Sequence, residues 1–519
     1  MHPPMALADM GDAVDRIERA LAAGETIFVH GDYDVDGICA TALLTRALRS
    51  LGGTVVPFVP HRMRDGYDLT RAGVERARRA GAGLLVTCDS GIRAHDAVGY
   101  ARQVGIDVIV TDHHTPAETL PPATAVVNPG RTDCRYPEKG LCGTAVVFKV
   151  MEALHERRGR DRQELLVHLD LVALATIADL VPLVGENRVL ARFGLRYLAH
   201  TSKVGLRALL EVCGMGAATG DGSLEAGQVG FQLAPRINAV GRLGDAGDAL
   251  ELLLTEDPVR ARHLAHALDA LNTKRREEDR RTLDGALQSL SESYDPDRDF
   301  GVVIAEEGWH PGVIGIVASR VVERIHRPVI LIALDGDGGR GSARSIPDLH
   351  LYEALSECRE HLERFGGHRQ AAGMDLKASS VDALRKAFND AVRTRLGGTA
   401  PTPRIRADLA LPLDQATPEL HHWLEYLGPF GMGNPRPVFV AREAQLHGTP
   451  REVGRGHLKL QLAREGGPVE AIGFGLVARH PPSSLPSRVE LAFQLRENEF
   501  RGRRTLQARL LDLRAAGSG

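Results

Sequence analysis

The chain has 519 residues, of which 43% are hydrophobic and 25% are charged, and its formal net charge is −3. This composition excludes a disordered chain, and the near-neutral charge alone points to no polyanionic partner. The length is too great for one hydrophobic core and predicts about three domains.

The cysteines and the apolar segments of the chain indicate the cellular compartment in which the protein works. The six cysteines contain no Cys-x-x-Cys pair, which favours reduced thiols over a disulfide framework or a zinc site. The N-terminus lacks a basic flank followed by an apolar stretch. The most apolar long window, 165–184, contains His168, Asp170 and Asp179, which argues against a transmembrane helix. We therefore expect a cytoplasmic protein with no membrane partner.

The first 200 residues alternate short apolar runs with segments of helical periodicity. This alternation predicts an α/β fold with a parallel sheet. The expected strands are 26–29, 55–59, 84–87 and 106–110, and the expected helices include 38–51, 72–80 and 169–178.

The next segment predicts further helices. Residues 201–250 read as partly helical, with a glycine-rich break at 214–222. A long helix is expected over 257–290, with Pro258 in its first turn. Its middle, 274–281, is charged on all sides, which is typical of a helix that bridges two domains through solvent.

A second, smaller α/β unit is expected after this helix. Strands at 301–305 and 328–332 flank a helix at 313–325, and glycine-bearing turns follow at 341–345 and 366–368. Residues 391–404 read as a linker. Short strands at 437–442, 457–463, 468–474, 488–496 and 503–511 then predict a small β-barrel. The expected divisions are a catalytic domain (1–255), a bridging helix (256–295), a second α/β domain (296–398) and a barrel domain (399–519).

Residues that can bind metal ions follow the predicted elements of the first domain. Loops at the carboxyl ends of parallel strands meet in one crevice. Several carboxylates crowd into one crevice only where cations offset their repulsion. The sequence therefore predicts a clustered divalent-metal site from His30, Asp34, Asp36, Asp89, His113, His114 and Asp179.

Two metal ions about 3.5–4 Å apart suit phosphoryl chemistry, because they stabilise both the attacking and the leaving oxygen. Imidazole mixed with carboxylate favours Mn²⁺, whereas Mg²⁺ prefers an all-oxygen shell. Alone, Asp34-x-Asp36 would more often be a loop or helix cap. Asp32, Thr111 and Asp112 are interpreted as supporting or turn residues.

Three motifs together resemble a known family. The run His30 to Gly37, with Asp112-His113-His114, resembles the DHH phosphoesterase superfamily, and Gly366-Gly367-His368 resembles the glycine turn of its associated second domain. The stretch 427–435 and the predicted barrel resemble the OB-fold of the bacterial single-strand-specific exonucleases of that superfamily. The resemblance covers nearly the whole chain.

The resemblance implies roles for individual residues. One metal would be held by His30, Asp34 and Asp89, and the other by Asp36, Asp89, His113 and Asp179. Asp36, Asp89 and His114 would be catalytic, as would Asn238 and Arg236 from a loop at 235–242, although a glycine-punctuated connector explains that segment almost as well. Substrate would be bound by Ser342, Arg344, Gly367, His368 and Arg280; for Arg280 a solvated helix face is the more common role.

The implied function is a two-metal 5′→3′ exonuclease that degrades single-stranded DNA to 5′-mononucleotides in DNA repair and recombination. Its cofactors would be two Mn²⁺ ions, with Mg²⁺ possible. A monomer is expected, with a helicase or single-strand-binding protein as candidate partners. Two alternatives stay open: a phosphodiesterase for oligonucleotides or cyclic dinucleotides, and an inactive strand-binding subunit of a replication complex.

Overall fold

The first domain is built on a parallel sheet. The computed structural model describes residues 1–62, 64–66, 68–215, 224–500 and 503–517. The strand order is β2–β1–β3–β4–β5, and every pair is parallel, as predicted. The strands are β1 (Thr26–His30), β2 (Thr54–Phe58), β3 (Ala82–Cys88), β4 (Asp107–Thr111) and β5 (Ala125–Val127).

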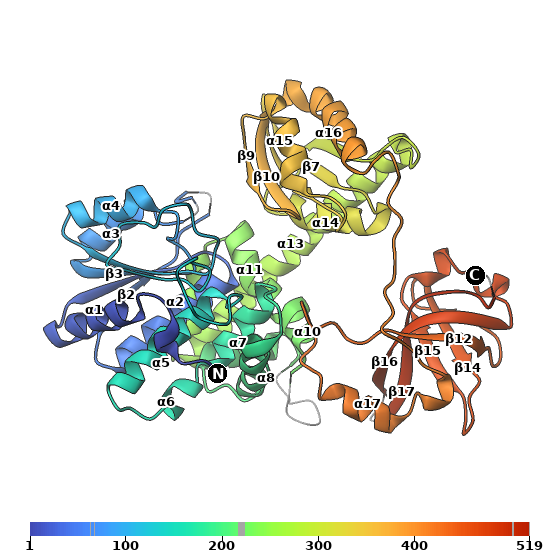
Figure 1. The fold of residues 1–519 in the computed structure, drawn as a ribbon, viewed down its shortest axis with the longest axis horizontal. Helices are drawn as coiled ribbons and strands as arrows, with labels where there is room; N and C mark the ends of the chain where they lie inside the picture. The colour runs from blue at the N-terminus through green and yellow to red at the C-terminus, as the bar shows by residue number, and fades with distance from the viewer. Residues whose placement is uncertain (63, 67, 216–223, 501–502, 518–519) are drawn as a thin grey trace.

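Helices cover both faces of this sheet because its strands are apolar on both sides. Ile27 and Val29 of β1 pack with α1 (Met10–Ala23), α2 (Val35–Ser50) and α5 (Gly143–Arg157). Phe28 points to the other face and packs with α3 (Arg71–Arg79) and α4 (His95–Gln103). The sheet with its two helical layers forms the left-hand part of Figure 1.

A helical extension follows the sheet. Its elements are α6 (Gln163–Leu166), α7 (Leu169–Ala178), α8 (Gly185–Ala199), α9 (Val204–Val212), α10 (Ala226–Gln228), a π-helical turn η2 (Val229–Leu233), α11 (Ala234–Leu243) and α12 (Ala246–Leu254). The segment 235–242 is therefore part of a helix, and the predicted loop was wrong. Gly241 does not break α11, because its bare Cα allows close packing on the carbonyl oxygen of Tyr33. The predicted glycine-rich break at 214–222 lies mostly outside the described residues.

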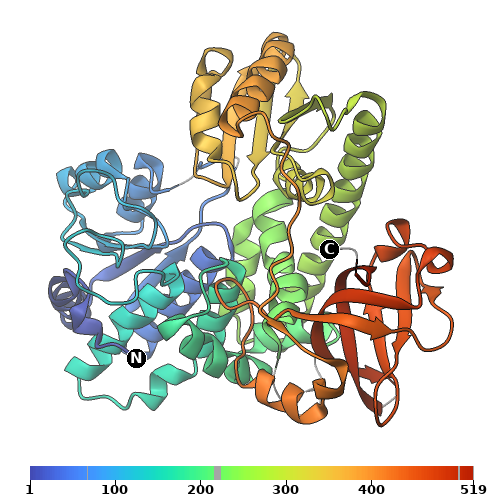
Figure 2. The same ribbon diagram turned by 45° about the vertical axis from the view of Figure 1, so that its right-hand side comes forward.

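The long helix α13 (Pro258–Ser293) joins the first domain to the second, as Figures 1 and 2 show. Its charged middle was expected to lie wholly in solvent, which was wrong on one face. Arg275 and Asp279 are buried and form an ion pair at 2.9 Å, and the Oδ1 of Asn272 accepts from the same guanidinium. This pairing lets the charges pack against neighbouring helices.

The second domain has a mixed five-stranded sheet of order β6–β7–β8–β10–β9. The glycines of both predicted turns lie in strands instead: 341–344 belong to β8, and Gly366 and Gly367 end β9. His368 begins the short connection from β9 to β10. Glycines recur in β8 because neighbouring side chains fill the space; a Cβ at Gly341 would lie 2.7 Å from Met374 Cγ. The elements are β6 (Val302–Glu307), α14 (Ile314–Ile325), β7 (Val329–Asp335), β8 (Gly338–Arg344), α15 (Leu351–Glu357), β9 (Arg364–Gly367), β10 (Ala371–Lys377) and α16 (Val381–Arg395).

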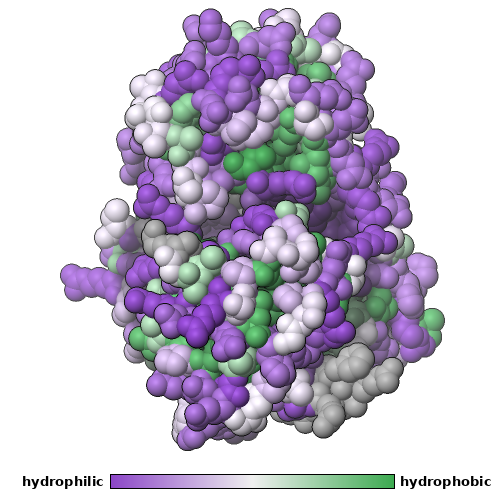
Figure 3. Space-filling model, turned by 90° about the vertical axis from the view of Figure 1, so that its right-hand side faces the viewer, coloured by the Kyte–Doolittle hydropathy of each residue, from purple (hydrophilic) through white to green (hydrophobic). Residues whose placement is uncertain are grey.

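The third domain is a seven-stranded sheet of order β11–β12–β16–β17–β15–β14–β13 around its own core. Because α16 continues to Arg395, the linker begins later than the predicted residue 391. Figure 3 shows mostly hydrophilic side chains on the side of the molecule on which this domain lies in Figure 1. No helix among the described residues is long and apolar enough to cross a membrane. The elements are β11 (Leu409–Ala410), α17 (Pro418–Glu425), β12 (Phe439–Gln445), β13 (Arg451–Val453), β14 (His457–Leu462), β15 (Val469–Gly473), β16 (Arg488–Phe500) and β17 (Arg503–Ala515).

Candidate metal centre

The start of α2 carries two of the predicted acids. Asp34 is the N-cap residue of α2 and accepts a hydrogen bond from the Gly37 amide at 3.1 Å. Asp36 lies in the first turn, where its two carboxylate oxygens accept from the amides of Gly143 and Thr144 at 2.7 Å each. These amides belong to the N-terminus of α5, whose dipole favours negative charge. Asp36 is thereby held in one position while buried.

Asp89 follows β3 in a strained backbone conformation. Its φ is +61°, and its amide donates to the Thr111 carbonyl of β4 at 2.9 Å. Gly143 allows it to approach α5, since a Cβ at position 143 would lie 2.6 Å from the Asp89 side chain. An aspartate with a positive φ has a strained backbone, and strained residues of this kind cluster at functional sites.

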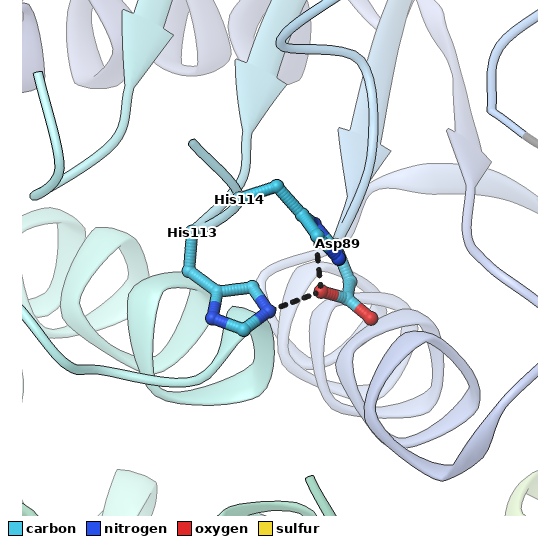
Figure 4. Close-up of side chains that lie close together, drawn as sticks. All are labelled: Asp89, His113 and His114. Carbon is cyan, nitrogen blue, oxygen red and sulfur yellow. Dashed lines mark ion pairs between the residues drawn. The ribbon is translucent and has the colours of Figure 1, made fainter. Parts of the chain in front are cut away.

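The imidazole of His113 points into the same crevice. Its Nε2 lies 3.1 Å from Asp89 Oδ1, 3.6 Å from Asp179 Oδ2 and 3.9 Å from Asp36 Oδ2. The approach to Asp89 is drawn in Figure 4. Among the described residues, neither His113 Nε2 nor Asp89 Oδ1 has a hydrogen-bond partner, although both are buried. Atoms that converge in this way without bonding each other leave room for a shared cation.

Three sets of ligand atoms lie within 4.8 Å of one another in this crevice. One set belongs to Asp89, His113 and His114, another to Asp36, His113 and Asp179, and a third to Asp32, Asp34 and Asp89. His30 is in none of them. Its buried Nδ1 has no hydrogen-bond partner in the part of the chain that the structure describes, and a Cβ at Gly73 would lie 2.9 Å from its Nε2. Burial lowers its pKa to about 4, so the imidazole is neutral, the form that binds metals.

The carboxyl groups of the crevice are buried close together, and this raises the pKa values of several of them. Burial, followed by repulsion from Asp36 and Asp34, raises the pKa of Asp179 to about 8 and that of Asp89 well above its ordinary range. Burial and Asp36 likewise raise the pKa of Asp34, and burial and Asp34 raise that of Asp32. A divalent cation would offset this repulsion, and the mixture of carboxylate oxygen and imidazole nitrogen fits Mn²⁺.

His114 is held by Asp112. Its Nδ1 lies 2.8 Å from Asp112 Oδ1, which also accepts from the amides of His113 and His114. Burial lowers the pKa of His114, but the Asp112 hydrogen bond and nearby carboxylates outweigh it and raise the pKa to about 9. Without bound metal, His114 is therefore a cation at neutral pH. Asp112 has the supporting position that the sequence suggested.

A second set of cations comes from both domains. Arg344 of β8 donates to Ser342 Oγ at 3.0 Å and to the Ala343 carbonyl at 2.8 Å, and burial alone lowers its pKa. Both side chains lie against Gly315 in the first turn of α14, where a Cβ would come within 2.9 Å of each. Arg242 of α11 donates to the Gly312 carbonyl at 2.8 Å; burial, then Arg62, lowers its pKa to about 10. Asp279 partly offsets the charge of Arg242, but neither Arg242 nor Arg344 forms an ion pair with a carboxylate among the described residues.

The remaining predicted residues lie in different places. Asn238 reaches the crevice, since its Oδ1 accepts from the Val35 amide at 3.2 Å. Arg236 is not brought there; it pairs with Asp269 of α13 at 2.9 Å, because residues two apart on a helix face opposite sides. Arg280 is exposed on α13. Gly367 ends β9, where a Cβ would lie 2.5 Å from the Ala371 carbonyl, and the exposed His368 follows it.

Three family models match the chain. They describe the DHH family N-terminal domain over residues 26–176, the DHHA1 domain over 299–394 and the RecJ OB domain over 407–512. The single-stranded-DNA-specific exonuclease RecJ of Dickeya dadantii is 42% identical, over 96% of this chain and 89% of the relative. This chain belongs to the RecJ family.

Other RecJ comparisons agree. The Bacillus subtilis exonuclease is 38% identical over 98% of the chain, which spans 64% of that relative. The crystal structure of Thermus thermophilus RecJ with Mn²⁺ matches with a TM-score of 0.82 at 36% identity, over 98% of this chain and 72% of the other. The same protein with Mg²⁺ matches with a TM-score of 0.78. The expected fold class, with its DHH, DHHA1 and OB units, is confirmed.

The sequence analysis assigned no metal or phosphate contact to three individual residues of this candidate site. Asp32 was interpreted as a supporting residue, yet its carboxylate lies with those of Asp34 and Asp89. Its position in the Asp-x-Asp-x-Asp run was an available signal. Arg62 and Arg242 come together only in the folded chain, and the sequence around Arg62 carries no motif that marks it.

Proposed function

We propose that this chain hydrolyses phosphodiester bonds of single-stranded DNA from the 5′ end and releases 5′-mononucleotides, with two Mn²⁺ ions, or Mg²⁺ in their place, as cofactors. The observation that carries the proposal is the convergence of Asp36, Asp89 and Asp179 on Nε2 of His113, which has no hydrogen-bond partner among the described residues. The relatives named as single-stranded-DNA-specific exonucleases support the choice of substrate.

We assign the metal ligands from these contacts. Asp36, Asp89, His113 and Asp179 would hold one ion. Asp34 and Asp89 would hold the other with His30, and Asp32 is the alternative to His30 on geometry. Such a pair would activate water as the nucleophile and would offset the charge of the phosphoryl group.

Backbone amides and side chains of this chain would hold the proposed metal ligands in place and contact the phosphate. The α5 amides fix Asp36, and Asn238 fixes the start of α2 through the Val35 amide, which makes Asn238 a positioning residue. His114, held by Asp112, would donate its Nε2 proton to a phosphate oxygen. Arg236 keeps a structural place beside Asp269.

The arginines between the domains suit a phosphate group. Arg344 and Ser342, with the N-terminus of α14, offer charged, hydroxyl and backbone donors together. Arg242 and Arg62 add charge from the first domain. A terminal phosphate carries more charge than a phosphodiester, so this cluster favours a strand end, and we attribute the 5′ polarity to it. Gly367 and His368 would approach the same phosphate, and Arg280 would guide the strand.

We further propose the domain divisions, the compartment, the oligomeric state and the cellular role of this protein. The chain would divide at residues 255, 295 and 398 into catalytic domain, bridging helix, second α/β domain and barrel. It would act as a cytoplasmic monomer in DNA repair and recombination, beside a helicase or single-strand-binding protein. All six cysteines are free thiols, which fits a reducing compartment.

The test is degradation of a long single strand labelled at either end. With Mn²⁺, the 5′ label should appear first as mononucleotide, while the 3′ label stays in a shortening strand. Asp36→Ala should abolish cleavage, and Asp96→Ala, an exposed aspartate of α4, should behave as wild type. Full cleavage by Asp36→Ala would remove Asp36 from the site.

The alternatives are less well supported. A phosphodiesterase for dinucleotides has no need of the barrel that the RecJ OB model matches over 407–512. An inactive strand-binding subunit has no use for a crevice whose buried acids repel one another. Hydrolysis of dinucleotides but not of long strands would favour the phosphodiesterase. Binding of single strands without hydrolysis would favour the inactive subunit.

A further inference from the structure

The strand β6 forms one edge of the second domain's sheet, and β9 forms the opposite edge. A cavity of about 540 Å³ is lined by residues 301–305 at this edge, by the end of α13 and by α16. In Figures 1 and 2 the last turns of α13 lie on the side of the second domain that is turned away from the first domain's sheet. The cavity shares no lining residue with the proposed metal centre or its phosphate contacts.

Part of the β6 backbone is left without hydrogen-bond partners. The neighbour of β6 in the sheet is β7, and the Val302 amide donates to the Pro328 carbonyl at 2.9 Å. Because the backbone groups of successive residues in a strand face opposite sides, those of Val303 and Ala305 face the cavity. The Val303 carbonyl accepts from Arg385 Nε at 3.2 Å. Among the described residues, the Val303 amide and both backbone groups of Ala305 have no partner.

This edge is recessed between two helices. Val302 and Ile304 pack with Leu290 of α13. On the other face of the sheet, Val303 packs with Phe388 of α16. Val303 is only 4% exposed, although it belongs to an edge strand. A single extended peptide fits between the helices and supplies the alternating donors and acceptors that the edge lacks. The β6 edge of a second copy carries the same two helices, which would collide with these.

Most charged groups of the cavity pair with one another. Arg298 pairs with Asp299, and Arg385 pairs with Asp382. Lys386, on the α16 wall, is exposed and has no ion pair in the described part of the chain. A peptide that places a carboxylate beside Lys386 is therefore favoured.

Glu307 gives such a peptide a direction. It is exposed at the C-terminal end of β6, on the same face as Val303, because side chains alternate along a strand. Val303 contacts Arg385, which precedes Lys386 on α16. A strand antiparallel to β6, the slightly more stable pairing, passes Glu307 about four positions before it reaches Lys386. Its sequence therefore carries a basic residue first and an acidic residue about four positions later.

We propose that the β6 edge is a docking site for an extended segment of another protein, which adds a strand to the second domain's sheet. The segment runs antiparallel to β6, with a basic side chain beside Glu307 and an acidic side chain beside Lys386. Apolar side chains between them pack on Leu290. The inference does not depend on the proposed function, because the site uses no metal ligand.

The test uses a capped, fluorescent peptide of sequence Lys-Val-Thr-Val-Glu, whose binding to the full chain is measured by anisotropy. Bound peptide should slow hydrogen exchange at the amides of Val303 and Ala305. The threonine of the peptide faces Ala305, so N-methylation of its amide should weaken binding about five- to tenfold. N-methylation of the second valine amide, which faces away from β6, is the matched control and should change the affinity less than about twofold.

Variants of the chain test the same contacts from the other side. Ala305→Pro removes an amide that faces the cavity and not β7, and should weaken binding at least about fivefold. Lys386→Glu should weaken binding about three- to tenfold, and a peptide ending in lysine instead of glutamate should restore it. Lys377→Glu, at an exposed lysine of β10 outside the cavity, should match wild type.

Three outcomes would overturn the docking site. They are no binding at about 1 mM peptide, equal binding of the two methylated peptides, and unchanged exchange at residues 303 and 305. Dimerisation of the chain that Ala305→Pro abolishes would make a second copy the occupant and would also overturn the proposal. Failure of the wild-type chain to degrade single strands would refute the proposed function and leave this prediction of peptide binding unchanged.

Discussion

Replacing Asp179 by asparagine should stabilise the metal-free protein. A carboxyl whose pKa is raised by folding destabilises the fold once the pH exceeds the unfolded value, and the cost grows until the pH passes the folded value. For Asp179 these values are 3.8 and about 8. The difference of about 4 units corresponds to an upper limit of about 6 kcal/mol at 1.36 kcal/mol per unit. Because this shift belongs to a cluster of interacting carboxyl groups rather than to Asp179 alone, we expect about 2–4 kcal/mol at pH 8.

The assay is thermal unfolding of the first domain, followed by calorimetry in EDTA at pH 5 and pH 8. A gain of this size should raise the transition of Asp179→Asn above that of wild type by about 5–10 °C at pH 8. The difference should shrink at pH 5. Adding Mn²⁺ should reverse the order, because ligand binding stabilises wild type by about 3–4 kcal/mol at 100–1,000 times its Kd and the variant by less.

Asp170→Asn on the same helix is the matched control. Asp170 is buried too, but Lys203 Nζ lies 2.8 Å from its carboxylate. Breaking that pair should destabilise the domain by about 3–5 kcal/mol with or without metal. If Asp179→Asn were destabilising in EDTA like Asp170→Asn, the acids of the crevice would not repel one another, and the inference of a cation-dependent cluster would fail.

Three further substitutions test separate parts of the site. Gly143→Ala should displace the Asp89 side chain and weaken Mn²⁺ binding at least about tenfold by calorimetric titration; unchanged affinity would exclude Asp89 as a ligand. Arg344→Met should lower kcat/KM about 10- to 100-fold, the value of one charged hydrogen bond, and a wild-type rate would place the phosphate elsewhere. Asn238→Ala should cost about 1 kcal/mol of stability by leaving the Val35 amide unpaired and lower kcat, and an effect on KM alone would contradict a positioning role.

Much of the metal centre could be predicted because its residues follow regular elements. Asp34, Asp89 and His113 each come at the end of an apolar strand or in the loop after it, and the rule that such ends meet in parallel sheets brings them together. Asp179 followed from the end of an apolar helix in the same way. Of the residues proposed to bind a phosphate group, Ser342 and Arg344 could be predicted from the sequence. Arg242 and Arg62 could not, since they meet only through tertiary packing.

The errors came from interpreting glycine as a turn. Gly341 lies within β8, where it makes room for Met374, and Gly241 lies within α11, where it allows contact with Tyr33. In both places glycine provides close approach rather than a change of direction. The buried pair Arg275–Asp279 was missed for a related reason, since charge alone does not show that two side chains satisfy each other.

The central claim is that the crevice of the first domain holds two divalent cations. Anomalous diffraction at the manganese edge from crystals soaked in MnCl₂ tests it most directly. The account predicts two peaks about 3.5–4 Å apart, with Asp89 between them and His113 and Asp179 bound to one. No peak in the crevice, or one ion away from Asp89, would contradict it.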